Sequence, residues 1–249
     1  MNLDFKKIVE EKKYLDSEKE IPEDISQHIE ELKKVKRAQF KEYPEGVFED
    51  DTRNHTLKCV YIAKKVADER VFLDTVRTLW IHDIPELITG DLTVIEKYRD
   101  STSAKKFEKE ELDAAKKLLT PRDQELLIDF NNASKLLKNK PNQNNKKASP
   151  SSLLAKIIDN SEGNLMYHYC FTKWFKSKKY DQSNLPPKDS LQHTFITNEK
   201  FLQTIEQKIQ GSEKEVLVNF IKAVLVNAKR FWKEVPSERI PTVVKKHLH

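Results

Sequence analysis

Apolar residues recur at helical spacing through most of this chain, and this periodicity limits the fold more than any other feature of the sequence. In the segment 53–68, four apolar residues fall on one face of a helix: Cys59, Ile62, Ala63 and Val66. Only 4 of the 249 residues are glycine, whereas sheets need tight turns that usually draw on glycine. The abundance of Leu, Lys and Glu also favours helices by propensity. The sequence therefore predicts an all-α fold.

Proline and capping residues help to place the helices. Pro22 and Pro121 each suit a first helical position, and Thr120 suits the N-cap before Pro121. Together with the periodicity, they predict a helical stripe from Pro22 toward Arg37 and Phe40. They also predict helices over residues 3–15, 53–68, 71–83, 101–119, 121–137, 153–175, 198–209 and 213–231.

These helices are expected to form one main domain with additions at both ends. We expect a peripheral N-terminal helix in residues 1–20, the main helical bundle over 21–175, further helices packed on it over 176–235, and a frayed tail over 236–249. A polar, proline-containing stretch at 139–152 predicts a flexible loop inserted in the main domain. A chain of this length can bury a sizeable core.

The composition argues against a membrane protein and against a secreted one. No run of 18 or more apolar residues is present, so no transmembrane helix is expected. The N-terminus lacks the apolar region of a signal peptide. Cys59 and Cys170 lie far apart in helical patterns, which predicts free buried thiols in a reducing compartment. We therefore expect a cytoplasmic protein with no membrane partner.

The formal charge of +5 has a local origin. Residues 135–147 contain five lysines and no acid, so the rest of the chain holds 40 basic and 40 acidic residues. A solvated basic loop accounts for this excess. Binding to nucleic acid usually needs a basic face instead. Nucleic acid is therefore not expected to be the main ligand.

Two histidines and two aspartates have the spacing of a metal site. Imidazole nitrogen and carboxylate oxygen bind Zn, Mn, Fe or Co. His55 and Asp83 each lie on the apolar stripe of a helix, and the connection between these two helices is very short. The helices should therefore pack as an antiparallel pair, which brings the start of one beside the end of the other. His82 adjoins Asp83, and Asp159 lies at the margin of an apolar helical face.

Each of these residues has a simpler interpretation when it is taken alone. His55 could be a hydrogen-bonded core histidine, and Asp159 a half-exposed carboxylate. Asp83, however, would place a negative charge at a helix C-terminus, which opposes the helix dipole. Glu86 and Asp91 add two more acids nearby. A bound cation would relieve this accumulation, so a single metal site explains all of these placements.

Other candidate residues favour structural roles. His168 lies two and a half helical turns after Asp159, so it should point away from the site. His247 and His249 lie in the expected frayed tail. Four large aromatic residues are interpreted as core or dimer-face residues and not as a base-stacking surface: Trp174, Phe175, Phe231 and Trp232.

The stretch HDIPELITGDLT, which begins at His82, resembles the HD-domain superfamily of metal-dependent phosphohydrolases. More narrowly, it resembles the 5'-deoxynucleotidase branch, which comprises the bacterial YfbR-like and eukaryotic HD-domain-containing proteins. Residues 82–91 match an HDxxE motif followed by a hydrophobic pair and a Gly-Asp. Residues 32–40 match the upstream pattern LKxVxRxxW, and residues 156–159 match KxxD. The similar region extends from about residue 32 to 169.

The resemblance implies a role for each matching residue. His55, His82, Asp83 and Asp159 would bind one divalent metal, for which Zn, Mn, Fe, Co and Ni are equally suitable. Four further residues would act on the substrate and on the attacking water. Glu86 would orient or deprotonate the water, Asp91 would hold a substrate hydroxyl or the water network, Arg37 would contact the phosphate, and Phe40 takes the place of the tryptophan in the upstream pattern. A homodimer is expected from the resemblance alone.

Two segments depart from the family pattern, and they keep alternatives open. Arg53-Asn54 replaces the usual Ser-Asp/Glu before the first histidine, and residues 128–131 replace a Glu-Glu-Tyr-Glu-like segment. The preferred hypothesis is a 5'-nucleotidase acting on nucleoside or deoxynucleoside monophosphates. A second is a hydrolase of another phosphate ester or of a signalling nucleotide. A third is a degenerate domain that binds a nucleotide or a partner without turnover, although the intact Glu86 argues against it.

Overall fold

The fold is helical throughout the part of the chain that can be described. The computed structural model describes residues 3–37, 50–91, 101–137, 147–177, 188–210 and 212–248. Within these ranges the only β-type pairing is an isolated antiparallel bridge between Lys36 and Asp51. The predicted all-α class is confirmed.

The elements, with η marking 3-10 helices, follow one another in this order: α1 (Phe5–Glu10), η1 (Lys13–Glu20), η2 (Glu23–Ile25), α2 (Ser26–Glu31), η3 (Leu32–Lys34), α3 (Thr52–Val66), α4 (Phe72–Ile81), α5 (Glu86–Thr89), α7 (Ser101–Leu118), α8 (Pro121–Leu137), α9 (Pro150–Lys176), α10 (Lys188–Lys208), α11 (Ser212–Lys233), η6 (Ser237–Arg239) and α12 (Thr242–Lys245).

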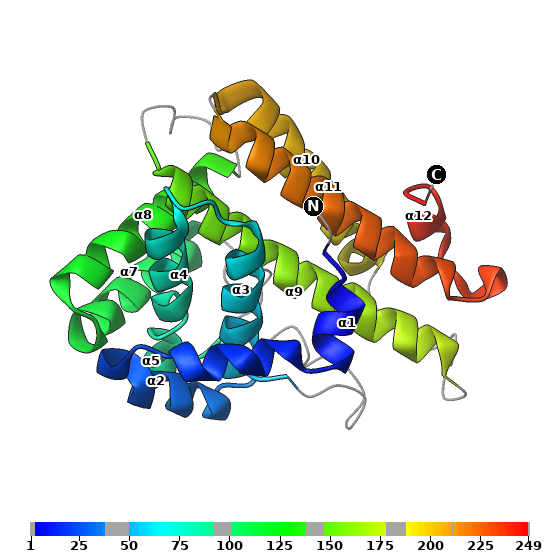
Figure 1. Ribbon diagram of the computed structural model, residues 1–249. Helices are drawn as coiled ribbons and strands as arrows, with labels where there is room; N and C mark the ends of the chain where they lie inside the picture. The colour runs from blue at the N-terminus through cyan, green and yellow to red at the C-terminus, as the bar shows by residue number, and fades with distance from the viewer. Residues whose placement is uncertain are drawn as a thin grey trace.

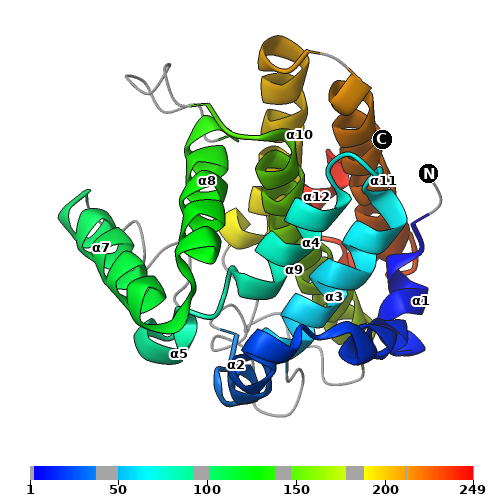
Figure 2. The ribbon, with the colours of Figure 1, turned by 60° about the vertical axis from the view of Figure 1, so that its left-hand side comes forward.

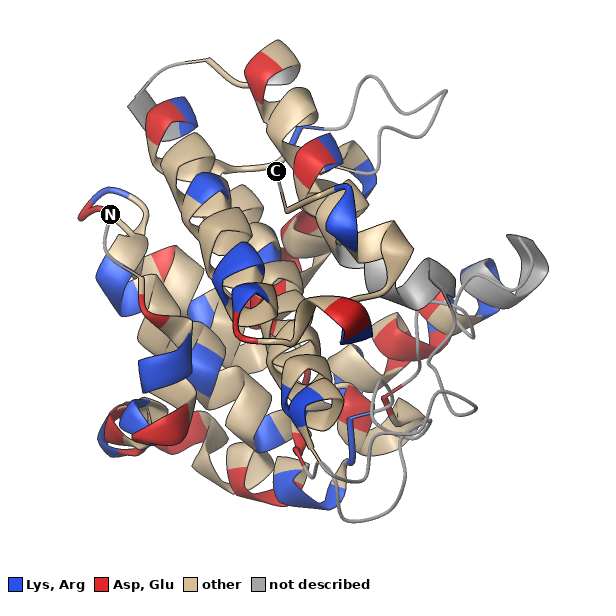
Figure 3. Cartoon of the chain, turned by 90° about the vertical axis from the view of Figure 1, so that its right-hand side faces the viewer, with Lys and Arg blue, Asp and Glu red and all other residues tan. Residues whose placement is uncertain are grey.

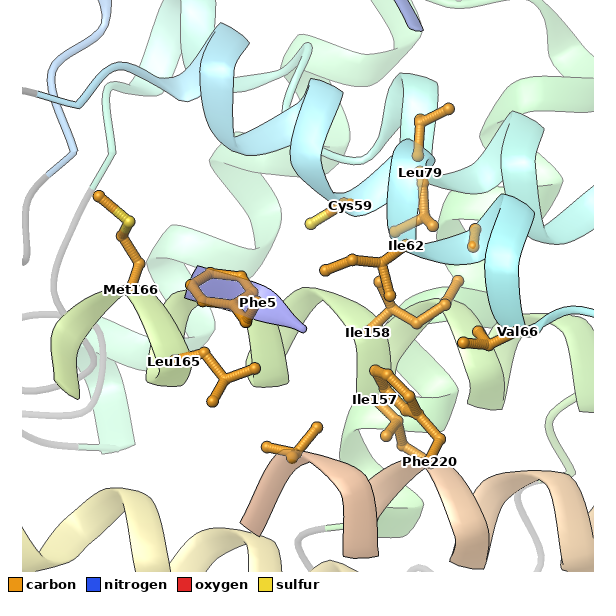
Figure 4. Close-up of a cluster of buried hydrophobic side chains, with 14 of the residues drawn as sticks. Phe5, Cys59, Ile62, Val66, Leu79, Ile157, Ile158, Leu165, Met166 and Phe220 are labelled. Carbon is orange, nitrogen blue, oxygen red and sulfur yellow. The ribbon is translucent and has the colours of Figure 1, made fainter. Parts of the chain in front are cut away.

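Helix α9 is the central element of the molecule. It has 27 residues and is about 40 Å long at 1.5 Å per residue. Helices α3, α4 and α8 contact it on one part of its surface, and α10 and α11 contact another part (Figures 1 and 2). Figure 4 shows Ile157 and Ile158 of α9 between Ile62 of α3 and Phe220 of α11. Because α9 is buried by neighbours on several sides, its polar residues are held in fixed positions.

The pairing expected of the helices around His55 and Asp83 is present. Helix α3 ends at Val66, α4 begins at Phe72, and the two helices contact each other along their lengths. The start of α3 therefore lies beside the end of α4. Asp51 caps α3, because its side chain accepts a hydrogen bond of 2.7 Å from the Asn54 amide.

Helices α8 and α9 both begin at a proline, Pro121 and Pro150. The start of α9 at Pro150 corrects the expected loop at 139–152. At α8, Thr120 Oγ1 accepts a hydrogen bond from the Asp123 amide, as predicted for the N-cap. Ser149 does the same for Ser152, with Pro150 at the first helical position. Helix α9 therefore begins at Pro150, and the last three residues assigned to the loop are helical. Residues 138–146 lie outside the described ranges.

The expected N-terminal helix is two shorter pieces. Lys12 adopts a left-handed conformation with φ of 49°, which separates α1 from η1. The segment is also not peripheral, because Phe5 is fully buried in the core. Arg53 of α3 forms ion pairs with Glu18 of η1 at 2.7 Å and with Glu30 of α2 at 2.6 Å. These ion pairs attach η1 and α2 to α3.

The expected frayed tail is ordered and packed in the structure. Residues 237–239 and 242–245 are helical, and Val244 is fully buried. The His247 ring stacks on Phe195 of α10, with centroids 5.0 Å apart and an interplanar angle of 5°. Helix α10 itself begins at Lys188, ten residues before the expected start. Apolar contacts that are distant in sequence stabilise this tail, so its local polarity did not indicate them.

Other expectations about the core are confirmed. Cys59 and Cys170 are free, buried thiols. The four large aromatic residues named above are buried between the helices.

On the face shown in Figure 3, basic and acidic residues are interspersed along the helices. No helix in the described ranges is both long enough and apolar enough to cross a membrane.

Asn227 of α11 connects the N-terminal segment to the C-terminal helices. Its side-chain amide donates hydrogen bonds to the carbonyl oxygens of Leu3 (2.6 Å) and Ala223 (2.9 Å). Its side-chain oxygen accepts one from the Phe5 amide at 3.1 Å. A leucine at this position would fill similar space but would leave two buried backbone groups without these partners.

We expect Asn227→Leu to lower the free energy of unfolding by about 2–4 kcal/mol, because each buried polar group left unsatisfied costs about 1–3 kcal/mol. Urea denaturation measures this change. Val226→Ala is the matched control, since Val226 is the neighbouring residue on α11 and is 64 % exposed. Equal stability of the two variants would contradict the structural role of Asn227.

Candidate functional site

The four residues predicted to bind a metal meet where α3, α4 and α9 come together. His55 comes from the first turn of α3, His82 and Asp83 follow the end of α4, and Asp159 lies on α9. His55 Nε2 is 3.4 Å from His82 Nε2 and 3.2 Å from Asp159 Oδ1. Asp83 Oδ2 is 3.1 Å from His82 Nε2 and 3.7 Å from His55 Nε2. Helix packing thus brings together residues that are about 100 positions apart.

The separations between these atoms suit a metal ion. Donor atoms about 2.1 Å from a common ion at tetrahedral angles lie roughly 3.4 Å from one another. The distances among His55, His82 and Asp159 run from 3.2 to 3.8 Å, and Asp83 adds distances of 3.1 and 3.7 Å. His55, His82 and Asp159 also form a compact group in which all ligand atoms lie within 4.8 Å. The donor set therefore fits one divalent cation.

The hydrogen bonds of the imidazole rings leave the correct nitrogens facing the site. His82 Nδ1 lies 2.8 Å from the Leu79 carbonyl oxygen, so it must carry the proton that it donates. The Nε2 atom of the neutral ring then presents a lone pair. His55 Nδ1 hydrogen-bonds to Glu162 Oε2 in the same way, which directs its Nε2 inward. Two ring nitrogens 3.4 Å apart repel each other unless a proton or a cation lies between them.

The carboxylates have the electrostatic properties of cation ligands. Asp83 Oδ2 is buried and receives no hydrogen bond from any residue that the structure describes. Burial opposes ionisation of Asp83, but the adjacent His82, together with His55 and Arg37, outweighs it and lowers the pKa of this carboxyl. An ionised, buried oxygen with no hydrogen bond is costly, and a cation at this point would offset the cost.

Asp159 is oriented by a lysine one turn before it. Lys156 Nζ contacts Asp159 Oδ2 at 2.7 Å, which leaves Oδ1 facing the two histidines. Burial opposes ionisation of Asp159, but the Lys156 charge and the two neighbouring histidines prevail and hold its pKa well below the usual range. Lys156 in turn lies over the Phe130 ring, 4.4 Å from its centroid. The Lys-x-x-Asp pattern is therefore one unit on α9.

The predicted substrate residues lie beside this cluster, except for Phe40, which is outside the described residues. Arg37 Nη1 is 3.8 Å from Asp83 Oδ2 and 3.7 Å from Asp91 Oδ2. Its Nε makes no hydrogen bond to a described residue. Glu86 is buried, and the Thr52 hydroxyl lies 3.4 Å from its Oε2.

A cleft opens from these residues to the surface. Its volume is about 590 Å³, and Glu86 and Asp91 are among the residues that line it. Val35 and Leu87 supply apolar walls, and Lys34, Lys36 and Glu31 add charges of both signs. Ligand sites of this kind commonly enclose about 300–1,000 Å³ and combine apolar walls with a few polar groups. The cluster is therefore next to a space that a small phosphate ester can fill.

Glu162 is a site residue that sequence reasoning missed. It is fully buried on α9, one turn after Asp159, and it contacts both His55 Nδ1 and Lys58 Nζ. Burial opposes its ionisation, but Lys58 and His55 lower its pKa. A carboxylate on the outer nitrogen of a metal-binding histidine is a common arrangement that fixes the ring. The spacing of three residues from Asp159 and the helical period could have indicated it.

Cys59 lies close to the same ring without adding a second metal site. Its Sγ is 3.7 Å from His55 Nε2 and 3.8 Å from Nδ1. Burial raises the pKa of this thiol to about 12, whereas a metal ligand must be the thiolate. Glu162, the third member of this group, already faces the Lys58 ammonium. Cys59 and Glu162 therefore orient the His55 ring and do not form a second metal site with it.

His168 is separate from the site, as expected. It lies deeper along α9, where its Nδ1 accepts a hydrogen bond of 2.9 Å from Trp232 Nε1. Burial and the nearby His247 lower its pKa to about 3, so the ring is neutral. The residue belongs to the core between α9 and α11.

Comparison with known proteins supports the same region. A family model described as HD domain matches residues 29–195 of the chain, which is about two thirds of its length. The matched range contains all the site residues described above. Comparisons with the curated proteins and with the solved structures found no match.

We expect His82→Ala and Asp159→Ala each to abolish stabilisation by added Co²⁺. A ligand at 100 times its Kd stabilises the folded protein by about 2.7 kcal/mol, and loss of a metal-binding side chain forfeits that free energy. Thermal unfolding with Co²⁺ and with chelator, together with metal content, measures the effect. His247→Ala is the control, because its ring packs on α10. Unchanged metal content in both variants would refute the ligand assignment.

Proposed function

Because the chain belongs to the HD-domain family, whose members are generally metal-dependent hydrolases, we propose that it hydrolyses the phosphate ester of nucleoside or deoxynucleoside 5'-monophosphates. The observation that carries this proposal is the convergence of four metal-type donor atoms, with Arg37 close to Asp83 and with the buried Glu86 lining an adjacent cleft. The 5'-nucleotidase specificity rests on the motif in residues 82–91 and on the shape of this cleft.

The metal would be held by His55, His82, Asp83 and Asp159. A divalent cation bound by such residues supplies positive charge to the phosphate oxygens and lowers the pKa of water. The rest of the chemistry depends on the side chains around the cluster.

Glu86 would accept the proton of the attacking water. It is buried, lies three residues after Asp83, and lines the cleft. The Thr52 hydroxyl is 3.4 Å from Glu86 Oε2 and 3.1 Å from the Val35 carbonyl oxygen, so its single proton can serve only one of them at a time. A general base must lie within reach of the water whose proton it accepts, and a carboxylate at this position meets that requirement.

Arg37 would bind the phosphate. Its guanidinium is held between Asp83 and Asp91 at distances longer than hydrogen bonds, so its donors are not committed to these carboxylates. Burial opposes its charge, but Asp91 and Asp83 keep its pKa above the usual value. A planar guanidinium suits phosphate oxygens and can stabilise charge on the group in transfer.

The cleft supports a substrate of nucleotide size. Val35 and Leu87 offer apolar contact for a sugar and base, and Asp91 can accept a hydrogen bond from a sugar hydroxyl. Lys34 and Lys36 at the opening would attract an anionic substrate.

One observation favours a second candidate, a domain that binds a phosphate ester without turnover. Phe130 lies in the segment where the family pattern has acidic residues, and its ring packs against His82 with centroids 5.5 Å apart. A phenyl ring cannot share a proton with the site. The buried Glu86 beside the cleft favours the enzyme, because binding alone does not require a base there.

The first test is phosphate release from a panel of nucleoside and deoxynucleoside 5'-monophosphates, with chelated protein reloaded with Mn, Co, Mg or Zn. We expect Glu86→Gln to lower kcat by about 10²–10⁴-fold, the usual contribution of a general base, while metal content stays at the wild-type level. Glu125→Gln, an exposed site on α8, is the control and should keep full activity.

No phosphate release with any metal, from wild-type protein that is folded and metal-loaded, would remove the nucleotidase proposal. Binding of nucleotides by that protein would then favour the second candidate. Release that Glu86→Gln does not affect would show that another group accepts the proton.

A further inference from the structure

Lys58 is a buried cation that the proposed chemistry does not use. It lies next to the four candidate metal-binding residues. Its side chain is 2 % exposed and lies on α3, one turn after His55. The ammonium hydrogen-bonds to Asp50 Oδ2 at 2.6 Å and forms an ion pair with Glu162 Oε1 at 2.7 Å. Burial opposes its charge, but the two carboxylates outweigh burial and raise its pKa. Lysine is rarely buried so completely unless it is paired, because desolvation of the charge is costly.

The contact of Lys58 with Glu162 connects it to the candidate metal-binding residue His55. Glu162 has one oxygen on Lys58 and the other on His55 Nδ1. With Oε1 held by the ammonium, rotation of the carboxylate about its terminal torsion is restricted, and Oε2 stays on the imidazole. His55 therefore keeps Nε2 directed at His82 and Asp159. Mutation of a carboxylate in this position typically lowers metal affinity by about 10–100-fold.

The second contact of Lys58 leads to the segment that carries Arg37. Asp50 binds Lys58 with its side chain, and its backbone oxygen accepts a hydrogen bond of 3.3 Å from the Arg37 amide. The Thr52 amide binds the Val35 carbonyl oxygen at 3.0 Å beside it. These two bonds pair the segment before α3 with the segment that contains Arg37. The position of the guanidinium thus depends on a backbone that Asp50 anchors to α3.

We propose that Lys58 is a positioning residue for both halves of the site: through Glu162 it orients the metal-binding His55, and through Asp50 it holds the backbone that places Arg37 on the phosphate. This inference rests on the proposed function for its phosphate-binding half. The two acids that contact Lys58 would have different roles: Glu162 would act on the metal half of the site, and Asp50 on the phosphate half. No other described residue contacts both acids through one charged group.

A purely structural role for this ion pair makes a different prediction. Buried ion pairs replaced by apolar or neutral groups of similar shape are often neutral for stability. A neutral replacement of all three residues should therefore fold, and a merely structural role would leave ligand binding unchanged. Positioning by charge would not survive that replacement.

The experiment compares Lys58→Met, Lys58→Arg, Glu162→Gln and Asp50→Asn with the wild type. Co²⁺ affinity and the visible absorption spectrum of the Co²⁺-loaded protein report on the metal half, and the affinity of the loaded protein for inorganic phosphate reports on the other half. Lys64→Met, on the same helix and paired with Glu20, is the matched control. The triple variant Lys58→Met/Glu162→Gln/Asp50→Asn covers the case in which Lys58→Met does not fold.

We expect Lys58→Met and Glu162→Gln each to weaken Co²⁺ binding by about 10–100-fold and to alter the Co²⁺ spectrum. The double variant Lys58→Met/Glu162→Gln should bind Co²⁺ no more weakly than the weaker-binding of the two single variants, because both changes interrupt one chain of contacts. Lys58→Arg should restore most of the Co²⁺ affinity. Asp50→Asn should leave Co²⁺ affinity within about twofold and weaken phosphate binding by roughly 2- to 30-fold, the range for residues that couple two sites.

Wild-type Co²⁺ and phosphate affinities in folded Lys58→Met, or in the triple variant, would overturn the inference and leave a structural ion pair. Additive losses in the Lys58 and Glu162 double variant would overturn it as well, because they would mean independent effects. A wild type that binds Co²⁺ and phosphate but hydrolyses no nucleotide would refute the proposed function alone, since the affinities still decide the role of Lys58. A wild type that binds no Co²⁺ would overturn both.

Discussion

The contact between His55 of α3 and two carboxylates of α9 connects the fold to the site. Asp159 and Glu162 lie one helical turn apart, and they face the two nitrogens of the same imidazole ring. This arrangement requires α3 to pack closely against α9, which the apolar residues on both helices achieve around Ile62 and Ile158. The ring is fully buried, so its surroundings have a low capacity to screen charge. The hydrophobic core thereby sets the geometry of a polar cluster that would be weak and mobile in water.

The residues that depart from the family pattern have identifiable roles in this molecule. Arg53 stands where the family pattern has serine, two positions before the first histidine, and it forms ion pairs with Glu18 and Glu30 that attach the N-terminal segments to α3. Phe130 stands in the altered α8 segment and packs on both Lys156 and His82. Both substitutions change contacts around the site and leave the four donor residues in place. In this structure they alter packing and ion pairing around the four donor residues.

The charge distribution around the cluster is consistent with a cation and an anion binding side by side. The acids near the donors carry an excess of negative charge, which Arg37 and Lys156 reduce only in part. On the other side, Arg37 lies beside Asp91, which lines the cleft, and the exposed Lys34 and Lys36 line the cleft as well. A divalent cation and a phosphate would each occupy the region of opposite charge. The buried Lys58 lies between the contacts that lead to these two regions.

Sequence alone determined the helical class, most helix bounds to within a few residues, and the neighbourhood of His55 and Asp83, because these depend on local periodicity, capping and one short connection. It also determined the buried free thiols and the family motif. The tertiary structure decided what local pattern does not encode: the role of Glu162, the buried Lys58 between two acids, the break at Lys12, and the packed tail around Val244. The start of α9 at Pro150 was indicated by the same Ser/Thr-Pro signal as α8, but a polar composition obscured it. Each of the other features depends on contacts between residues far apart in the chain, where the energy of burial and ion pairing overrides local preference.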